Sequence, residues 1–388
     1  MTQHIAGFTS TGSKRPETLF GVHDPELPSR MTRSSGCRVW DEAGREFVDY
    51  LMGLGSVALG YGHREVTRAA VEAVSAGVVG PLAPTLEEEL AADICRLMPW
   101  IEQVRFLKTG AEAMAAAVRL ARVVTGRDYV LGCGYHGWLD WCQGAAGVPQ
   151  STRALYGELP FNQPQRAREL IRAAGDRLAA VVFEPVIVAE PELEWLSVLR
   201  EETAHSGALL VIDEIKTVCR LAIGGASQRY RLRPDLVVMG KALANGFPLS
   251  AVGGRREVMD AASRTWISST LATEFVSLAA ARATLEVMVS SQVTEHLHRV
   301  GSRLHQGLKE LHQEHPDLIA GVGGIPEMCF LQYGDETVSR AVTAACAQQG
   351  LLFKRSAYNF VSLAHGAAEI DGTITQLREA LSAVAKPA

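Results

Sequence analysis

Three ionisable residues stand just behind apolar runs of the chain. Glu184, Asp213 and Lys241 are separated by 29 and 28 residues. The apolar runs before them are residues 179–183, 208–212 and 236–239. Continuous apolar runs are typical of strands covered on both faces, and this spacing is typical of strand–helix units in a parallel sheet. Because such sheets bind ligands at their carboxyl edge, we expect the three side chains to meet in one crevice, although charged residues also end strands simply where the chain leaves the core.

Lys241 and Asp213 form the pair with the most specific chemistry. A lysine at the mouth of a buried crevice loses solvation, which lowers the pKa of its amine and makes it a nucleophile able to form a Schiff base. A carboxylate one strand away could hold a protonated ring nitrogen. Pyridoxal phosphate requires this combination, because the lysine carries its aldehyde and the carboxylate keeps its ring electron-withdrawing. The simpler interpretation of Lys241 is an ordinary cation at the start of a helix.

A second segment could hold the phosphate of such a cofactor. The Ala-rich residues 111–124 predict a helix, and Thr109-Gly110 precedes them. Amides at a helix N-terminus bind phosphate. Tyr135 offers a flat aromatic face that could stack on the cofactor ring. Together with the lysine–aspartate pair, these residues favour a pyridoxal-phosphate enzyme.

Two other patterns suggest different chemistry. Residues 132–137 match G-x-G-x-x-G after a predicted strand, with Glu158 further on, and this dinucleotide fingerprint makes an NAD-dependent oxidoreductase the alternative. The aromatic residue inside that loop and the lack of a predicted helix after it argue against the alternative. Histidines repeat every seven residues at 298, 305 and 312 without clustered carboxylates, which indicates a solvated helix face and no metal site.

The composition limits the class of protein. The chain has 388 residues, a net charge of −5 and 47% hydrophobic residues, so we expect neither extended disorder nor a nucleic-acid partner. No apolar run reaches the roughly 18–20 residues that cross a bilayer, and the first 20 residues lack the apolar core of a signal peptide. Seven cysteines without a C-x-x-C pair are typical of reduced thiols. We therefore expect a cytoplasmic protein with no membrane partner.

The pattern of elements predicts two domains. Residues 39–50 predict a small hairpin around the turn at 42–45. The alternation of helices and short apolar runs ends at about residue 275. We expect a large cofactor-binding domain over residues 51–285. Residues 1–50 and 286–388 are expected to supply a smaller α+β domain.

Several segments together resemble the class III aminotransferases of fold type I, and most closely their glutamate-1-semialdehyde aminomutase-like branch. The resemblance extends over about residues 36–372, with the motifs in the order of the family. The matching segments are residues 104–113, 119–122, 125–128, 135–137, 212–215, 240–246 and 362–365. Residues 135–138 with Trp141 look like a sub-branch found in surface-polysaccharide and natural-product pathways.

The resemblance implies an α/β fold whose large domain holds a mostly parallel seven-stranded sheet. It also implies roles for the matching residues. Lys241 would carry pyridoxal phosphate and move the proton, and Asp213 would pair with the ring nitrogen. Tyr135 and Ile215 would cover the two ring faces, and Tyr135 is also counted as catalytic. The other implied cofactor contacts are His136, Glu184, and the phosphate-binding Thr109, Gly110 and Ala111. Thr270 would reach the phosphate in the neighbouring subunit, which implies a homodimer.

The chain departs from the family pattern at three places. Thr109-Gly110-Ala111 stands where the family usually has Ser-Gly-Thr, so a hydroxyl ligand of the phosphate is missing. Residues 273–275 replace Gly-Asn-Pro, and Val218-Cys219 replaces the Gly-Phe that commonly precedes the position of Arg220. None of these changes touches Lys241 or Asp213. They predict a reshaped substrate pocket.

We therefore expect an aminotransferase that moves an amino group from a donor, L-glutamate or another amino acid, to a ketone or aldehyde acceptor. Secondary-metabolite pathways, such as aminoglycoside or aminocyclitol synthesis, and surface-polysaccharide synthesis are the expected settings. An aminomutase or an epimerase is the alternative, because both use the same lysine and aspartate. Arg30, Arg33 or Arg220 could bind a substrate carboxylate through two hydrogen bonds, or be a surface or interface charge.

Overall fold

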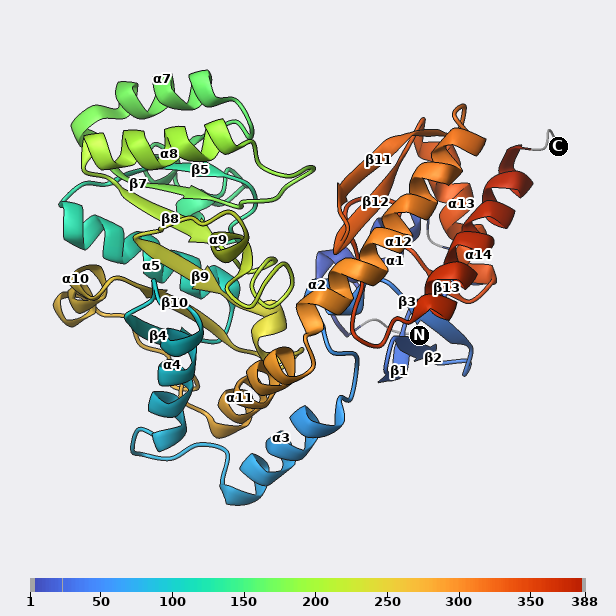
Figure 1. The fold of residues 1–388 in the computed structure, drawn as a ribbon, viewed down its shortest axis with the longest axis horizontal. Helices are drawn as coiled ribbons and strands as arrows, with labels where there is room; N and C mark the ends of the chain where they lie inside the picture. The colour runs from blue at the N-terminus through green and yellow to red at the C-terminus, as the bar shows by residue number, and fades with distance from the viewer. Residues whose placement is uncertain (1–3, 23, 386–388) are drawn as a thin grey trace. The chain divides into compact units, whose positions relative to one another are not determined.

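The computed structural model describes residues 4–22 and 24–385, which form two compact units (Figure 1). One unit comprises residues 64–294, and the other joins the N-terminal residues up to 63 to residues from 295 onward. The predicted domain limits at residues 50 and 285 stay a prediction. The long helix α12 (Val293–Glu314) begins just before the division between the units.

The larger unit is built on one seven-stranded sheet. Its strand order is β4-β10-β9-β8-β7-β5-β6, and β10 runs antiparallel to both of its neighbours while the other pairs are parallel. The strands are β4 (Gln103–Leu107), β5 (Tyr129–Cys133), β6 (Tyr156–Glu158), β7 (Leu178–Phe183), β8 (Leu209–Asp213), β9 (Leu236–Met239) and β10 (Ser250–Gly254). The prediction of an α/β fold with a mostly parallel seven-stranded sheet is confirmed.

Helices cover both faces of this sheet. α5 packs against one face, while α7 and α8, drawn side by side in green in Figure 1, pack against the other. The helices of the unit are α3 (Arg64–Ala76), α4 (Thr85–Leu97), α5 (Gly110–Thr125), α6 (Gln150–Arg153), α7 (Pro164–Ala174), α8 (Leu193–Ser206), α9 (Gly225–Arg229), α10 (Arg256–Met259) and α11 (Phe275–Ser290). Every side chain of β7 and β8 is buried, because successive residues point to opposite faces of the sheet and helices cover both faces. Val182 and Val211 join the core beneath α5, and Val181 and Leu210 join the core beneath α7 and α8.

The smaller unit holds two further sheets. One has the strand order β1-β2-β3-β13 and the other β11-β12-β14. The strands are β1 (Met31–Ser35), β2 (Arg38–Asp41), β3 (Glu46–Asp49), β11 (Ile319–Ile325), β12 (Met328–Tyr333), β13 (Leu351–Leu352) and β14 (Asn359–Phe360). The helices are α1 (Pro16–Phe20), α2 (Met52–Gly55), α12, α13 (Glu336–Gln348) and α14 (Ala367–Ala385). The antiparallel pair β2–β3 confirms the predicted hairpin.

Two of the alternative patterns can be compared with the structure. Between the glycine-rich loop that ends at Gly137 and helix α6 lies only a three-residue 3₁₀ helix, so the loop does not lead directly into an α-helix as the dinucleotide fingerprint requires. His298 and His312 are hydrogen-bonded to Glu327 and to the Ile319 carbonyl. Within residues 4–22 and 24–385, no group of three or more His, Cys, Asp or Glu side chains could hold a metal ion, and no helix has the length and apolarity to cross a membrane.

Candidate active site

The predicted ionisable residues lie at the carboxyl ends of three neighbouring strands. Glu184 follows β7, Asp213 is the last residue of β8, and Lys241 stands two residues beyond β9. The strands pair in the order β7-β8-β9. Because these strands are parallel, their carboxyl ends lie at one edge of the sheet, as the spacing of the three residues predicts.

Lys241 lies at a strained turn. Its φ of +46° is in the left-handed region that residues with a Cβ rarely adopt, and such strain is common at functional sites. The residue keeps some exposure, but the protein around its amine removes much of the solvent. This desolvation lowers the pKa of Lys241 to about 8, from an ordinary value of 10.5, and repulsion from Lys216 adds to the shift. The carboxylates of Glu184 and Asp213 oppose it.

Asp213 is held by two hydrogen bonds. Its Oδ2 lies 2.8 Å from His136 Nδ1, and its Oδ1 accepts a bond of 3.1 Å from the Ile215 amide. Asp213 and His136 are 2% and 3% exposed, and the imidazole stacks on Trp141. A carboxylate has about four lone-pair positions, so Asp213 retains capacity for a protonated ring nitrogen.

The N-terminus of α5 presents amides, and its N-cap hydroxyl is hydrogen-bonded within the helix, so the predicted role of Thr109 in binding phosphate stays a prediction. Thr109 is the N-cap, and Glu112 completes a capping box that uses both the hydroxyl and the amide of Thr109. The amides of Gly110 and Ala111 belong to the first turn, where a helix offers no partner within itself. A Cβ on Gly110 would lie 2.7 Å from Ile215 Cδ1, so only glycine lets the start of α5 approach Ile215 this closely.

The loop that carries Tyr135 and His136 closes against the same helix start. A Cβ on Gly137 would lie 2.6 Å from the Ala111 Cβ, which shows how tightly the two segments pack. The Tyr135 amide donates a 3.0 Å hydrogen bond to Glu184 Oε2, while the Tyr135 residue is 67% exposed. Its ring is therefore accessible to a ligand, and its predicted stacking role stays a prediction.

Two buried residues near this edge carry no prediction from the sequence. Lys216 Nζ lies 2.9 Å from Glu184 Oε1, and both side chains are largely buried. Glu214 is fully buried and accepts hydrogen bonds from the Thr217 hydroxyl, the Ala226 amide and both the amide and hydroxyl of Ser227. Burial raises the pKa of Glu214 despite these donors. Glu214 thereby holds together the two ends of the loop that carries Ile215, Lys216 and Arg220. The only feature of the sequence that could have pointed to Glu214 is a second carboxylate directly after the apolar run 208–212 and Asp213.

The remaining predicted residues differ in their surroundings. Arg220 is fully buried in the same unit as Lys241. Thr270 is exposed, in a segment that also exposes Trp266 (81%) and Leu271 (52%). Arg30 and Arg33 belong to the other unit, where their guanidinium groups lie over the rings of Phe8 and Trp40. The structure therefore does not bring these two arginines to the strand ends within one unit.

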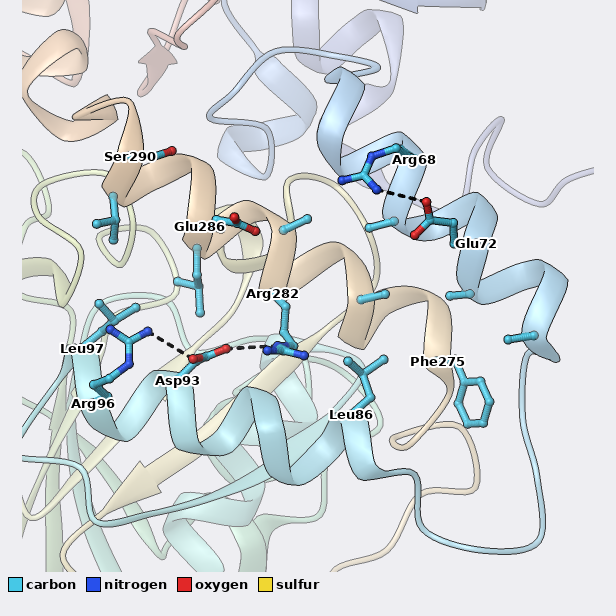
Figure 2. Close-up of a pocket in the computed structure, with 17 residues that line it drawn as sticks. Arg68, Glu72, Leu86, Asp93, Arg96, Leu97, Phe275, Arg282, Glu286 and Ser290 are labelled. Carbon is cyan, nitrogen blue, oxygen red and sulfur yellow. Dashed lines mark hydrogen bonds and ion pairs between the residues drawn. The ribbon is translucent and has the colours of Figure 1, made fainter.

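A groove of about 820 Å³ lies elsewhere in the larger unit, among α3, α4 and α11 (Figure 2). Five of its charged residues pair with one another: Asp93 accepts from Arg96 and Arg282, and Glu72 accepts from Arg68. None of the predicted cofactor residues lines this groove. The strand ends, and not this groove, are the candidate active site.

Comparison with known proteins identifies the family of the chain. The sequence pattern of the family described as aminotransferase class-III matches residues 20–384. Glutamate-1-semialdehyde 2,1-aminomutase of Thermomicrobium roseum is 36% identical, with 93% of this chain and 92% of that protein covered. An enzyme of the same name from Thermus thermophilus is 32% identical, with coverage of 98% and 97%.

Solved structures give the same result. The PLP internal aldimine form of FumI from Sphingopyxis has a TM-score of 0.89 at 28% identity, with 93% of this chain and 90% of that one covered. A β-phenylalanine aminotransferase from Variovorax paradoxus has a TM-score of 0.87 at 25% identity, with coverage of 98% and 91%. The chain therefore belongs to the class III aminotransferase family and is a pyridoxal-phosphate-dependent enzyme.

Proposed function

We propose that the chain is an aminotransferase that takes an amino group from L-glutamate or another amino acid and delivers it to a ketone or aldehyde. The observation that carries the proposal is the set of groups at one sheet edge. A lysine amine with a pKa lowered to about 8 stands one strand from the buried carboxylate of Asp213. The amides that begin α5 lie against Ile215, two residues beyond that carboxylate.

The residues present fit pyridoxal phosphate. When bound, the cofactor supplies the aldehyde that takes up the amino group and a ring that withdraws electrons from the substrate. The Gly110 and Ala111 amides would hold its phosphate. Asp213 would accept a hydrogen bond from the protonated ring nitrogen, and Tyr135 and Ile215 would enclose the ring.

Lys241 would then move the proton. Its amine is uncharged in about a tenth of molecules at pH 7 when the pKa is about 8, whereas an ordinary lysine is uncharged roughly 300-fold less often. An uncharged Nζ can accept a proton from a substrate carbon and return it. His136 would hold Asp213 in the orientation that faces the ring nitrogen.

The finer features of the function belong to the same proposal. Arg220 or Arg30 would bind a substrate carboxylate, and of these two Arg220 belongs to the unit that holds Lys241. Thr270 would serve the site of a second subunit in a homodimer, which the exposed Trp266 and Leu271 support as a surface to be covered. The free cysteines support a reducing, cytoplasmic location, and secondary-metabolite or surface-polysaccharide synthesis is the proposed setting.

An aminomutase is the second candidate, because the similar proteins from Thermomicrobium and Thermus bear that name. The two activities differ in their products. A transaminase makes one keto acid for each amino group it takes up, whereas an aminomutase needs no separate donor and leaves no keto acid.

The test is the absorbance of the purified holoenzyme before and after addition of L-glutamate. A transaminase should lose the visible band of the bound cofactor, gain a near-ultraviolet band and release 2-oxoglutarate in equal amount. An unchanged spectrum with every common amino acid would refute the aminotransferase and leave the aminomutase. Lys241→Ala is the control, and it should not form a borohydride-stable adduct with pyridoxal phosphate at residue 241. A normal turnover of this variant would refute the assignment of the site.

A further inference from the structure

A second lysine occupies the candidate active site. Lys216 stands three residues beyond Asp213, on the segment that leaves β8. Its neighbour Ile215 packs beside Gly240, where an added Cβ would lie 3.7 Å from Ile215 Cγ2, and the Glu214 amide donates to the Val238 carbonyl. The two segments that carry Lys216 and Lys241 therefore run alongside each other as they leave the sheet.

Glu184 holds Lys216 in this place. The carboxylate of Glu184 makes the 2.9 Å ion pair with Lys216 through Oε1 and accepts the Tyr135 amide through Oε2. The side chains of Lys216 and Glu184 are only 12% and 7% exposed. Both oxygens of Glu184 are thus used, and the positive charge of Lys216 offsets part of its negative charge.

Four charged groups act on the Lys241 amine, and they do not cancel. Glu184 and Asp213 favour its protonated form, while Lys216 and Arg220 disfavour it. Lys216 is the strongest of the four, after the desolvation that burial imposes. Lys216 acts twice in the same direction, because it repels the ammonium form directly and also offsets part of the charge of Glu184, which stabilises that form.

We propose that Lys216, held by Glu184, is a positioning residue whose positive charge disfavours the ammonium form of Lys241 and so raises the share of molecules in which its amine can accept a proton. The proposal rests on the proposed role of Lys241. A neighbouring cation is an established way for proteins to make a lysine nucleophilic. A cation at position 216 is needed for this effect, and a lysine-sized apolar side chain would not supply it.

The test measures the titration of Lys241 in the cofactor-free full-length chain. Trinitrobenzenesulfonate reacts only with uncharged amines, and the rate of labelling at each pH is followed by mass spectrometry of tryptic peptides. Arg220 lies between the two lysines, so trypsin separates them. Lys216→Met should move the midpoint for Lys241 upward by about one pH unit, which lowers the labelling rate at pH 7 about tenfold.

Two further variants separate charge from structure. Lys216→Arg keeps the cation, and its midpoint should stay near that of the wild type. Lys108→Met removes another largely buried lysine, whose Nζ lies 2.6 Å from Glu274 Oε1 and which is not one of the four charged groups named above. The Lys241 midpoint should be unchanged in this control. If Lys216→Met does not fold, Lys216→Gln removes the charge while its amide can still donate to Glu184.

An unchanged Lys241 midpoint in the folded Lys216→Met or Lys216→Gln variant would overturn the proposal, as would an equal shift in Lys216→Arg. These outcomes are separate from a failure of the proposed function. That failure would appear as the absence of a borohydride-stable cofactor adduct at Lys241 in the wild type, whatever the titration shows.

Discussion

The buried lysine should make the stability of the cofactor-free enzyme depend on pH in a way that a single substitution removes. The pKa of Lys241 is lowered from an ordinary value of 10.5 to about 8. Below about pH 8 the folded and unfolded chains both carry the charged amine, and the folded chain bears the full cost of its desolvation. Between pH 8 and 10.5 the unfolded chain still holds a proton that the folded chain has released, so the stability of the folded state rises with pH.

The magnitude follows from the size of the shift. One pKa unit corresponds to about 1.4 kcal/mol, so the whole effect of Lys241 is about 3 kcal/mol. Integrated from pH 7 to pH 10, the wild type gains about 2–3 kcal/mol relative to Lys241→Met, which has a side chain of similar length and no charge to bury. At pH 7 the Lys241→Met variant should have the higher free energy of unfolding, because it buries no charge. This difference from the wild type should shrink by about 2–3 kcal/mol at pH 10.

The assay is urea unfolding of both cofactor-free proteins at several pH values, with the difference in the free energy of unfolding plotted against pH. Other groups that titrate in this range are common to both proteins and cancel in the difference. Lys309→Met, which removes an exposed lysine of α12, is the control and should follow the wild type at every pH. Parallel curves for Lys241→Met and the wild type from pH 7 to pH 10 would refute the argument that burial displaces the charge from Lys241.

Two further substitutions test the contacts around the cofactor site. His136→Phe should lower kcat about tenfold or more, because a hydrogen bond to a charged group contributes about 1.5–3 kcal/mol. His136→Asn should lose much less, because its amide nitrogen can take the place of Nδ1. Equal losses of kcat in the two variants would show that the hydrogen bond to Asp213 does not matter. Gly110→Ala places a Cβ 2.7 Å from Ile215 Cδ1 and should raise the dissociation constant of pyridoxal phosphate about tenfold in a fluorescence titration. Gly144→Ala is the control, because a Cβ at this position meets open space, and its dissociation constant should be unchanged. Equal dissociation constants for the two variants would contradict the close packing at the start of α5.

The strand ends could be predicted because their signal is local. An apolar run such as residues 179–183 has no solvated face, so it indicates a strand between two layers, and the structure shows why: alternate residues of β7 enter two different cores. The ionisable residues behind these runs then had to share one edge. The capping box at Thr109 could also have been predicted, because Thr109 and Glu112 form the S/T-x-x-E pattern in which the two side chains bond to the start of the helix.

The Lys216–Glu184 pair could not be predicted in the same way. The two residues follow different strands, and nothing in their spacing states that their side chains turn toward each other. A lysine beyond Asp213 is equally compatible with a solvated loop. Only the packing of Ile215 beside Gly240 and the second bond of Glu184 to the Tyr135 amide determine that Lys216 is buried in the site.

Residues 273–275, where the sequence departs from the family pattern, contain Glu274, whose contacts the structure shows. Glu274 is the N-cap of α11 and accepts the amides of Val276 and Ser277. The same carboxylate pairs with Lys108, which directly precedes the N-cap of α5. Although burial opposes the charged form, these donors lower the pKa of Glu274, so the pair stays ionic at neutral pH.

The replacement therefore changes what ties the start of α11 to the start of α5, where the Gly110 and Ala111 amides lie. It adds no group to Asp213 or Lys241. The charged groups Lys216 and Arg220, which disfavour the protonated form of the Lys241 amine, lie instead on the loop fixed by Glu214.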